Sequence, residues 1–444
     1  MFKYLPHTHE DIAAMLKTIG VDDIDALFGD VPKSLRHKDI KIPDSLSEIE
    51  MHQHFAALSK MNTPLIPFMG AGAYDHYTPS VIRHLIERQE FLTAYTPYQP
   101  EISQGTLQYI FEFQSMITQL TGMDVSNASM YDGATATGEA MFMACALSRK
   151  ETIFISATVN PNIVNVVKTY ADYKGITVVM IDEADGQTSL ASLEAQLAHT
   201  STAGLIVQTP NVYGIIEDLT GFKEMLEAHK ALMIINQDPS TLAHLKTPRA
   251  WGADIAVGDC QTLGVPLSFG GPYIGYMATL TKYMRKMPGR ICGVTQDTDG
   301  KRAFVLTLQA REQHIRRDKA NSNICSNQSL LALFVTIYMS IMGKKGVYEV
   351  QQRSYDNAHY MYERLLAMPA FSEYASQPFF KEFTLRTTLD VAAMNQALQA
   401  AGFLGPLPFS KFDQAKHDLV TFALTEKRTK QEIDTVLDII QEVA

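Results

Sequence analysis

Short, continuous apolar runs recur through the middle of the chain, and most intervals between them are long enough for a helix. Continuous apolarity, in place of alternating apolar and polar positions, is typical of strands that are buried on both faces of a sheet. The pattern therefore predicts an α/β domain with a mainly parallel sheet. The predicted strands cover residues 152–156, 176–181, 204–208, 231–236, 254–257 and 273–277.

Polar residues follow three of these predicted strands directly, at 209–211, 236–238 and 258–261. Ligands of open parallel sheets bind outside the carboxyl ends of the strands. These three segments are therefore the first places where we expect a binding site.

The first 65 residues have a helical pattern. Ile12, Met15, Leu16 and Ile19 recur at the spacing of one helix face, and Ser47 with Glu50 is typical of a second helix start. The pattern predicts a helical N-terminal arm over residues 1–65. A helix with one apolar stripe needs a further surface to cover it, either in the rest of the chain or in a partner.

The last third of the chain predicts a second, smaller domain. A nearly apolar run at 330–342 is too short to span a bilayer and predicts a buried helix. From residue 379 onward, a strand, helix, strand, helix order predicts a small C-terminal α/β domain. We therefore expect a large α/β domain over 66–325 and a linking helix with the small domain over 326–444.

The amino-acid composition argues against several classes of function. The chain has 444 residues, with 38 Lys and Arg against 48 Asp and Glu, and a net charge of −10 argues against a general nucleic-acid binder. The histidine pairs His7/His9 and His52/His54 are two residues apart and point away from each other on a helix, so no metal site is predicted. The four cysteines are scattered, and the N-terminus has no apolar signal core. We expect a cytoplasmic protein without a membrane span.

The segment 95–105 concentrates polar and aromatic side chains in a stretch where Pro97 and Pro100 exclude a regular helix or central strand. Such a rigid polar loop suits substrate contact, although a merely aromatic turn is an equally good interpretation of the pattern. The candidate side chains are Tyr95, Tyr98, Gln99, Glu101 and Ser103.

The glycines Gly133 and Gly138 have the spacing of a phosphate-binding loop, and a helix is expected over 139–149. Glu139 and Ala140 stand where the lysine and the hydroxyl residue of a P-loop are required, so a P-loop is rejected. Two alternatives remain, a structural helix start and, less favoured, a backbone cradle for a phosphate.

The segment 311–319 packs four cations and His314 into nine residues. On a helix, Arg311 and His314 lie near one another, while Arg316 and Arg317 lead off different faces. Guanidinium groups suit carboxylates and phosphates, but a solvated charged face is the favoured interpretation from the residues alone.

Several strings distributed along the chain carry a family resemblance. They lie at 95–105, 127–129, 134–137, 251–255, 264–266, 270–272, 287–291, 311–317 and 322–325. Together they resemble the N-terminal half of glycine decarboxylase, the P-protein of the glycine cleavage system. At this chain length the resemblance is to subunit 1 of the two-subunit bacterial form.

The resemblance implies a fold-type-I enzyme of the pyridoxal phosphate (PLP) class, in which a lysine bears the cofactor and an aspartate pairs with the pyridine nitrogen. Counting back from 264–266 and 270–272, Gln261 stands at the lysine position and Asn236 at the aspartate position. An amide forms no Schiff base, and a neutral Asn cannot hold the pyridinium proton as a carboxylate does. The family pattern therefore implies that a lysine-bearing partner, glycine dehydrogenase subunit 2, holds the PLP.

The implied reaction is decarboxylation of glycine, after which the aminomethyl group passes to the lipoyl group of the H-protein. The implied partners are subunit 2, in a heterotetramer, and the lipoyl H-protein. As a hypothesis, the tyrosines and polar groups of 95–103 shape the glycine pocket, while the arginines attract the glycine carboxylate or the cofactor phosphate. The residues expected to face the shared site or to preserve the interface are Tyr95, Tyr98, Gln99, Glu101, Ser103, Arg311, His314 and Arg317.

Two alternatives belong to other classes of function. A purely structural subunit would stabilise its partner and contribute no side chain to the chemistry, but it would not need the polar density of 95–105. An independent PLP enzyme would need another lysine, and Gln261 and Asn236 argue against it.

Overall fold

The structure, a computed structural model, describes residues 6–36, 41–309, 313–320, 324 and 326–444. Two compact units make up the chain, residues 1–63 and 64–444. The first unit has two α-helices, α1 (His9–Ile19) and α2 (Glu48–Lys60), and both begin with the capping boxes Thr8/Asp11 and Ser47/Glu50. No residue of these two described helices is buried. Both predicted helices thus form, and apart from the half-buried Ile12 and Leu16 their residues are exposed.

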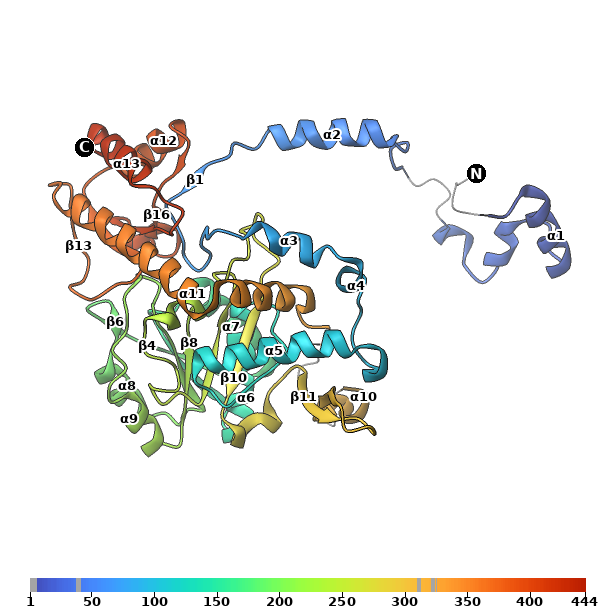
Figure 1. Ribbon diagram of the computed structural model, residues 1–444, viewed down its shortest axis with the longest axis horizontal. Helices are drawn as coiled ribbons and strands as arrows, with labels where there is room; N and C mark the ends of the chain where they lie inside the picture. Colours follow the sequence, from blue (N-terminus) through green and yellow to red (C-terminus); the bar gives the residue numbers. More distant parts are fainter. Residues whose placement is uncertain (1–5, 37–40, 310–312, 321–323, 325) are drawn as a thin grey trace. The chain divides into compact units, whose positions relative to one another are not determined.

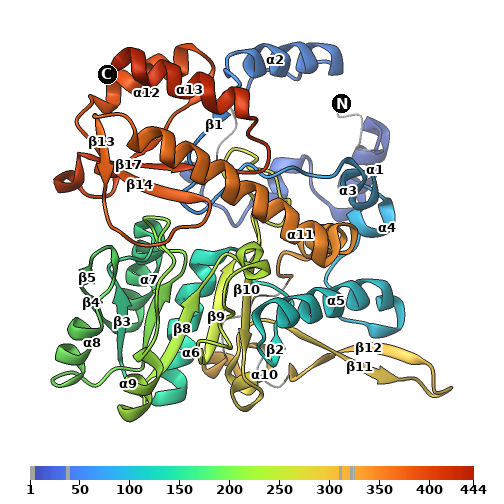
Figure 2. The same ribbon diagram turned by 60° about the vertical axis from the view of Figure 1, so that its left-hand side comes forward.

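The second unit is built on a seven-stranded sheet (Figure 2). The strands β9, β8, β7, β3 and β4 run parallel, which confirms the predicted mainly parallel sheet. The strand predicted at 273–277 forms at 275–279 and is antiparallel, because no helix lies between it and β9 to carry the chain back. In sheet order the strands are β2 (Val125–Ser126), β10 (Gly275–Thr279), β9 (Ile255–Asp259), β8 (Leu232–Asn236), β7 (Gly204–Gln208), β3 (Thr152–Ser156) and β4 (Thr177–Ile181).

Helices cover both faces of this sheet. Ile206 and Ile234 pack in one buried cluster with residues of α6 and α7, whereas Leu205 and Ile235 pack on the opposite face with residues of α8 and α9. Alternate residues of one strand therefore serve two cores, which explains why the strands are continuously apolar. The helices are α6 (Gly133–Ser148), α7 (Pro161–Lys174), α8 (Leu190–Leu197) and α9 (Phe222–Ala228).

A further group of elements lies beside β10. Helix α5 packs against the first half of α11 and beside the hairpin β11–β12 (Figures 1 and 2). The short helices α3 and α4 precede α5 in the chain. The bounds are α3 (Ser80–Ile86), α4 (Gln89–Leu92), α5 (Gln104–Thr121), β11 (Ile291–Gln296) and β12 (Arg302–Thr307).

Helix α11 (Ser329–Leu366) links the large sheet to the C-terminal lobe (Figure 1). By length and composition it could cross a membrane, but Ala332, Val335 and Tyr338 of its first half are buried in the protein core. The apolar run 330–342 thus forms a mostly buried helix, as predicted, and it ends at a kink, because Gly343 has the non-helical backbone angles φ 59° and ψ −177°.

The C-terminal lobe is a four-stranded antiparallel sheet covered by α12 and α13. Strand β1 (Ile66–Pro67) pairs with β15 (Phe403–Leu404), so the start of the second unit also belongs to this lobe. The domain boundaries expected at 65 and 325 stay predictions. The lobe's other elements are β13 (Phe371–Glu373), β14 (Glu382–Thr387), α12 (Val391–Ala400), β16 (Leu407–Pro408), β17 (Leu419–Ala423) and α13 (Lys430–Val443).

Candidate active site

A cavity of about 530 Å³ lies where three parallel strands end. Gln208, Asn236 and Asp259 are the last residues of β7, β8 and β9, and all three line it. This is the sheet edge that the strand pattern predicted as a binding site. We call it the central cavity. Its other polar and aromatic lining residues include Tyr74, Tyr131, Asp132, Asn160, Asp238, Thr262, Tyr273, Gln328, Lys381 and Glu382.

The start of helix α6 forms one wall of the cavity. The helix begins at Gly133 and not at residue 139 as expected, so the two glycines are helical residues and do not form a loop. A Cβ on Gly133 would lie 2.9 Å from the backbone nitrogen of Asp259, so close packing requires glycine there. The segment is thus a helix start in close contact with the end of β9, and phosphate binding there stays a prediction.

Two carboxylates cap this helix start. Asp132 Oδ1 accepts the Thr135 N–H at 2.8 Å, and Asp259 Oδ2 accepts the Gly133 N–H at 2.9 Å. These are N–H groups that a bound phosphate would use. Burial raises the pKa of Asp259 to about 7, and the nearby carboxyls of Asp132 and Asp238 act in the same direction, while the two backbone N–H groups that donate to it act against them.

A buried ion pair forms a second wall. Lys381 Nζ lies 2.7 Å from Asp238 Oδ2, and Asp238 Oδ1 accepts the hydroxyls of Ser240 and Thr262 at 2.7 and 2.5 Å. Burial opposes ionisation of Asp238, but the Lys381 ammonium outweighs it and lowers the pKa of that carboxyl. Lys381 is 3% exposed, and its ammonium also lies 4.4 Å from the centre of the Tyr74 ring.

His76 continues this network away from the cavity. Its Nε2 lies 3.1 Å from Lys381 Nζ and its Nδ1 lies 2.6 Å from Glu426 Oε2. Because an ammonium only donates, we assign the imidazole proton to Nδ1, which donates to Glu426. Burial and the Lys381 charge lower the pKa of His76, which keeps the ring neutral.

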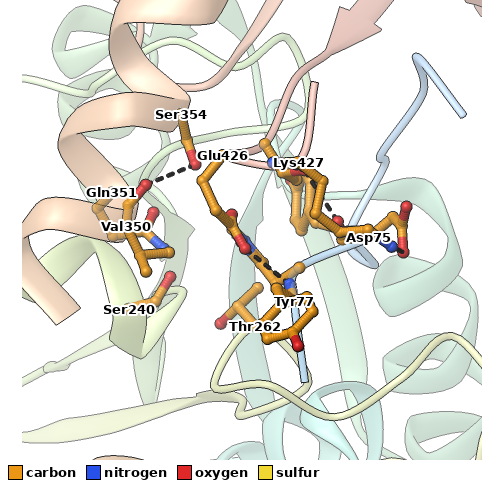
Figure 3. Close-up of polar contacts among 12 residues, drawn as sticks. Asp75, Tyr77, Ser240, Thr262, Val350, Gln351, Ser354, Glu426 and Lys427 are labelled. Carbon is orange, nitrogen blue, oxygen red and sulfur yellow. Dashed lines mark hydrogen bonds and ion pairs between the residues drawn. The ribbon is translucent and has the colours of Figure 1, made fainter. Parts of the chain in front are cut away.

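Glu426 and Lys427 of the C-terminal lobe contact the loop at residues 75–77, which carries His76 (Figure 3). Glu426 Oε1 accepts the Tyr77 N–H at 2.6 Å, and Lys427 Nζ lies 2.6 Å from Asp75 Oδ1. These contacts hold the Tyr74 side of the cavity in place.

Glu382, the first residue of β14, faces the same cavity. It accepts the Ala71 N–H at 2.6 Å and the Tyr74 hydroxyl at 2.8 Å. Burial raises the pKa of Glu382 to about 7, although the two hydrogen bonds and the Lys381 ammonium act in the opposite direction. The cavity thus contains a second carboxyl that ionises close to neutral pH.

Gln261 and Asn236 differ in where they point. Gln261 does not line the cavity, because its amide is hydrogen-bonded to the backbone N–H and C=O of Tyr74, at 2.8 Å each, and to the Val265 carbonyl. Asn236 lines the cavity and donates from Nδ2 to Thr137 Oγ1 at 2.8 Å.

The expected substrate segment lies outside the central cavity. Tyr95 is 79% exposed, and Tyr98, also exposed, stacks on the Arg290 guanidinium at 4.6 Å. Gln99 and Glu101 are exposed, and Ser103 is half-buried between a short 3₁₀ turn and α5. The segment's Thr96 hydroxyl lies 2.6 Å from that of Ser326, two residues before the cavity residue Gln328. The five candidates are therefore together, on one exposed segment near the cavity wall.

The cationic segment is only partly described. Arg311 lies outside the described residues, and His314 belongs to α10 (Gln313–Arg316), of which only the backbone is described at that position. Arg317 is exposed in a 3₁₀ turn with a positive φ of 54°. Of these three, only Arg317 has a described side chain, and it does not line the central cavity.

Comparisons with known proteins agree over the full length of the chain. The family model "Glycine cleavage system P-protein" matches residues 2–440. The chain belongs to this P-protein family. It is 48% identical to the "Probable glycine dehydrogenase (decarboxylating) subunit 1" of Desulforamulus reducens over 97% of this chain and 98% of that one. It is 47% identical to the protein of the same name from Moorella thermoacetica, covering 98% of each.

Solved structures identify the fold of this chain of the P-protein family. A crystal structure of glycine decarboxylase (P-protein) of the glycine cleavage system, in inhibitor-bound form, has a TM-score of 0.91 and 38% identity and covers all of both chains. A glutamate decarboxylase from Lactobacillus brevis has a TM-score of 0.69 at 14% identity and shows the fold alone, over 93% of this chain and 97% of that chain. The fold is that of the fold-type-I PLP enzymes, as predicted.

The residues present do not fit PLP in the central cavity of this P-protein-family chain. Carboxylates cap the helix start where a phosphate would bind, Asn236 is neutral, and Lys381 is paired with Asp238. A phosphate would meet like charge there.

Sequence reasoning missed the contribution of the C-terminal lobe to this cavity. Lys381 and Glu382 interrupt an otherwise aromatic run between Phe380 and Phe383. A charged pair inside a buried strand start was the available signal, because buried charges require partners. His76 carried no comparable signal.

Proposed function

We propose that this chain is the non-lysine-bearing subunit of glycine dehydrogenase (decarboxylating), an oxidoreductase of the glycine cleavage system. Membership of the P-protein family and full-length similarity to subunit 1 proteins support the activity. The observation that supports the division of labour is the carboxylate-capped start of α6, where Asp259 and Asp132 accept two of the N–H groups that a cofactor phosphate would use.

In this proposal the second subunit holds the PLP, which serves as the electron sink for decarboxylation. Glycine binds at the partner's cofactor, and the lipoyl group of the H-protein accepts the aminomethyl group. The complex is a heterotetramer and acts in the cytoplasm. This chain contributes side chains to the shared site, and these side chains lie outside its own central cavity.

The segment with Tyr95, Tyr98, Gln99, Glu101 and Ser103 is the first candidate for this contribution. Its aromatic and polar side chains are mostly exposed. Exposed aromatic surface of this kind is typical of a site that contacts another molecule. Arg311, His314 and Arg317 are the second candidate, with the arginines directed at the glycine carboxylate or the cofactor phosphate.

A glycine-dependent carbon dioxide exchange assay, with H-protein and PLP, tests the proposal on this chain alone and after mixing it with the candidate second subunit. Activity only in the mixture is the expected result. Activity of the chain alone would overturn the division of labour, as would a visible absorbance band of bound PLP in the isolated chain, which is the mark of an independent PLP enzyme.

A purely structural role is the second candidate, favoured by one observation: none of the five residues of the exposed segment lines this chain's own cavity. Tyr98→Phe separates the two candidates, because it removes only a hydroxyl and keeps the ring on Arg290. A fall in exchange activity of the mixture supports a shared site, and wild-type activity of both Tyr98→Phe and Arg311→Ala supports the scaffold.

A further inference from the structure

We propose that Arg290 is a positioning residue for glycine decarboxylation, which holds the Tyr98 ring in place on the segment 95–103. The proposal rests on the proposed function, because the place of Tyr98 matters for the reaction only if this segment faces the shared site. It adds a residue from outside the segment, on the evidence of the stacking of the two side chains and of the bonds that fix each of them.

Arg290 and Tyr98 form a stack between a buried cation and an exposed ring. Arg290 is 6% exposed and Tyr98 is 53% exposed, and Arg290 Cζ lies 4.6 Å from the centre of the Tyr98 ring. A cation within about 6 Å of an aromatic face is attracted to it, and the attraction grows when the cation is shielded from water. The guanidinium therefore supports the ring from the protein side and leaves the rest of Tyr98 open to another molecule.

The backbone around Arg290 is fixed by two neighbouring residues, Asn127 and Ala128. The Arg290 carbonyl accepts the Ala128 N–H at 2.8 Å. The Pro288 carbonyl accepts a hydrogen bond from Asn127 Nδ2 at 3.1 Å. Between these two carbonyls, Gly289 has a positive φ of 74°, and a Cβ there would lie 3.1 Å from Asn127 Nδ2. The turn that presents Arg290 is thus in close contact with its neighbours, and the side chain starts from a defined point.

The segment that carries Tyr98 is anchored on both sides of the ring. Before it, the Thr96 hydroxyl lies 2.6 Å from that of Ser326. After it, the Gln104 side-chain amide bonds to both backbone groups of Phe304, as donor at 2.9 Å and as acceptor at 2.8 Å. Tyr98 lies between these anchors, so the ring that Arg290 supports stands on a backbone that is itself held.

The string 127–129 also connects Arg290 to the wall of the central cavity. Ser129 Oγ accepts hydrogen bonds from the Gln328 N–H at 3.0 Å and from Asn327 Nδ2 at 2.7 Å. Gln328 lines the cavity. One short string thus fixes both the Arg290 backbone and a residue of the cavity wall, which ties the place of the Tyr98 ring to the body of the protein.

A charge at position 290 is informative, because packing alone would not require it. Burial of a guanidinium costs solvation free energy, and a methionine of similar length could cover the ring without that cost. The planar, permanently charged fork favours stacking on an aromatic face, in a way that a lysine ammonium on a flexible stem does not. The residue type therefore points to a fixed ring position, and misplacement of a group at a reaction site by about 1 Å can lower a rate about 100-fold.

The test measures glycine-dependent carbon dioxide exchange by the two-subunit mixture, with H-protein and PLP, for variants of the full chain. Arg290→Met should lower exchange activity about tenfold or more, because the Tyr98 ring loses its support. Arg290→Lys keeps a charge near the ring and should recover part of the loss. Arg353→Met, at an exposed arginine of α11, should have wild-type activity.

A double-mutant cycle separates positioning from folding. Tyr98→Leu removes the ring, so adding Arg290→Met to Tyr98→Leu should cause less than about a twofold further loss. In Tyr98→Phe, which keeps the ring, the full loss should remain. Losses that multiply in Tyr98→Leu, or wild-type activity of Arg290→Met, would overturn the proposal. If Arg290→Met does not fold, the same cycle with Arg290→Lys decides the matter.

Hydrogen exchange of the isolated full chain tests the support without the second subunit. The N–H groups of Tyr98, Ile102 and Ser103 are hydrogen-bonded within the segment. Arg290→Met should speed exchange in 96–103 about threefold or more and leave exchange in α13 unchanged. Unchanged exchange in the segment would contradict the positioning role.

Failure of this proposal is distinguishable from failure of the proposed function. An inactive wild-type mixture contradicts the proposed function. An active wild-type mixture in which Arg290 and Tyr98 are not coupled contradicts the positioning role alone.

Discussion

The central cavity and the segment 95–103 hold similar side chains in opposite states. In the cavity, each carboxylate of Asp238, Asp259 and Glu382 has hydrogen-bond partners within the chain. On the segment, Tyr95 is 79% exposed, and Thr96 with Ser326 supplies one side-chain link to the rest of the protein. The cavity carboxyls are thus held by the chain itself, whereas the side chains of the segment mostly face solvent.

The two regions should therefore contribute differently to the stability and to the function of this chain. Substitution of a buried, paired charged group lowers the free energy of unfolding strongly, because its partner is left as a buried charge without a counter-charge. Groups that are exposed contribute little to folding, so any large effect of their substitution must come from a partner or a substrate. Variants in the two regions should therefore respond in different assays.

The largest expected effect is on the cavity side. Lys381→Met leaves Asp238 buried without its cation and should lower the free energy of unfolding by about 3–5 kcal/mol, measured by urea denaturation. Lys345→Met, at an exposed lysine of α11, should change it by less than about 0.5 kcal/mol. Adding Asp238→Asn to Lys381→Met should restore part of the loss, and strict additivity of the two changes would contradict the pairing.

The second effect depends on pH. The pKa of Glu382 is raised to about 7 in the folded protein from 4.5, so its protonated form favours folding, and this contribution is lost as pH rises through about 7. Unfolding at pH 5 and pH 8 should show that Glu382→Gln loses less stability with rising pH than wild type, by about 1–3 kcal/mol. Glu194→Gln, at an exposed glutamate of α8, is the matched control. Parallel curves for wild type and Glu382→Gln would refute the assigned pKa.

The sequence predicts some walls of this cavity better than others. Asn236, Asp238 and Asp259 follow apolar runs, so the strand-end rule placed them together without any structure. Lys381 and Glu382 come from a strand of another sheet, and no local pattern brings that strand to the cavity.

The start of α6 shows a second limit. Gly133 to Gly138 is rich in glycine and threonine, which have low helix propensity, so the helix was expected to begin later. Close packing decides otherwise, since a Cβ on Gly138 would lie 2.7 Å from the Tyr170 ring. Tertiary contact overrides local propensity at such a position.

On the exposed side, Tyr95→Ser should leave stability of the isolated chain within about 0.5 kcal/mol of wild type. In the two-subunit mixture it should lower glycine-dependent exchange about tenfold if the segment faces the shared site. Tyr173→Ser, at an 89% exposed tyrosine of α7, controls for loss of surface aromatic area. Equal activity of the two variants would remove Tyr95 from the mechanism.

The smallest expected effect concerns how the segment is held. Thr96→Val replaces the hydroxyl that bonds to Ser326 with a methyl group of the same shape, in a partly exposed position. Water can replace the lost partner, so stability should fall by only about 0.5–1 kcal/mol. Because Ser326 lies two residues before the cavity residue Gln328, the losses of Thr96→Val and Lys381→Met should add in the double variant if the two regions are independent. A loss in the double variant that differs from the sum of the two single losses, measured by urea denaturation, would instead show that the segment and the cavity wall are coupled.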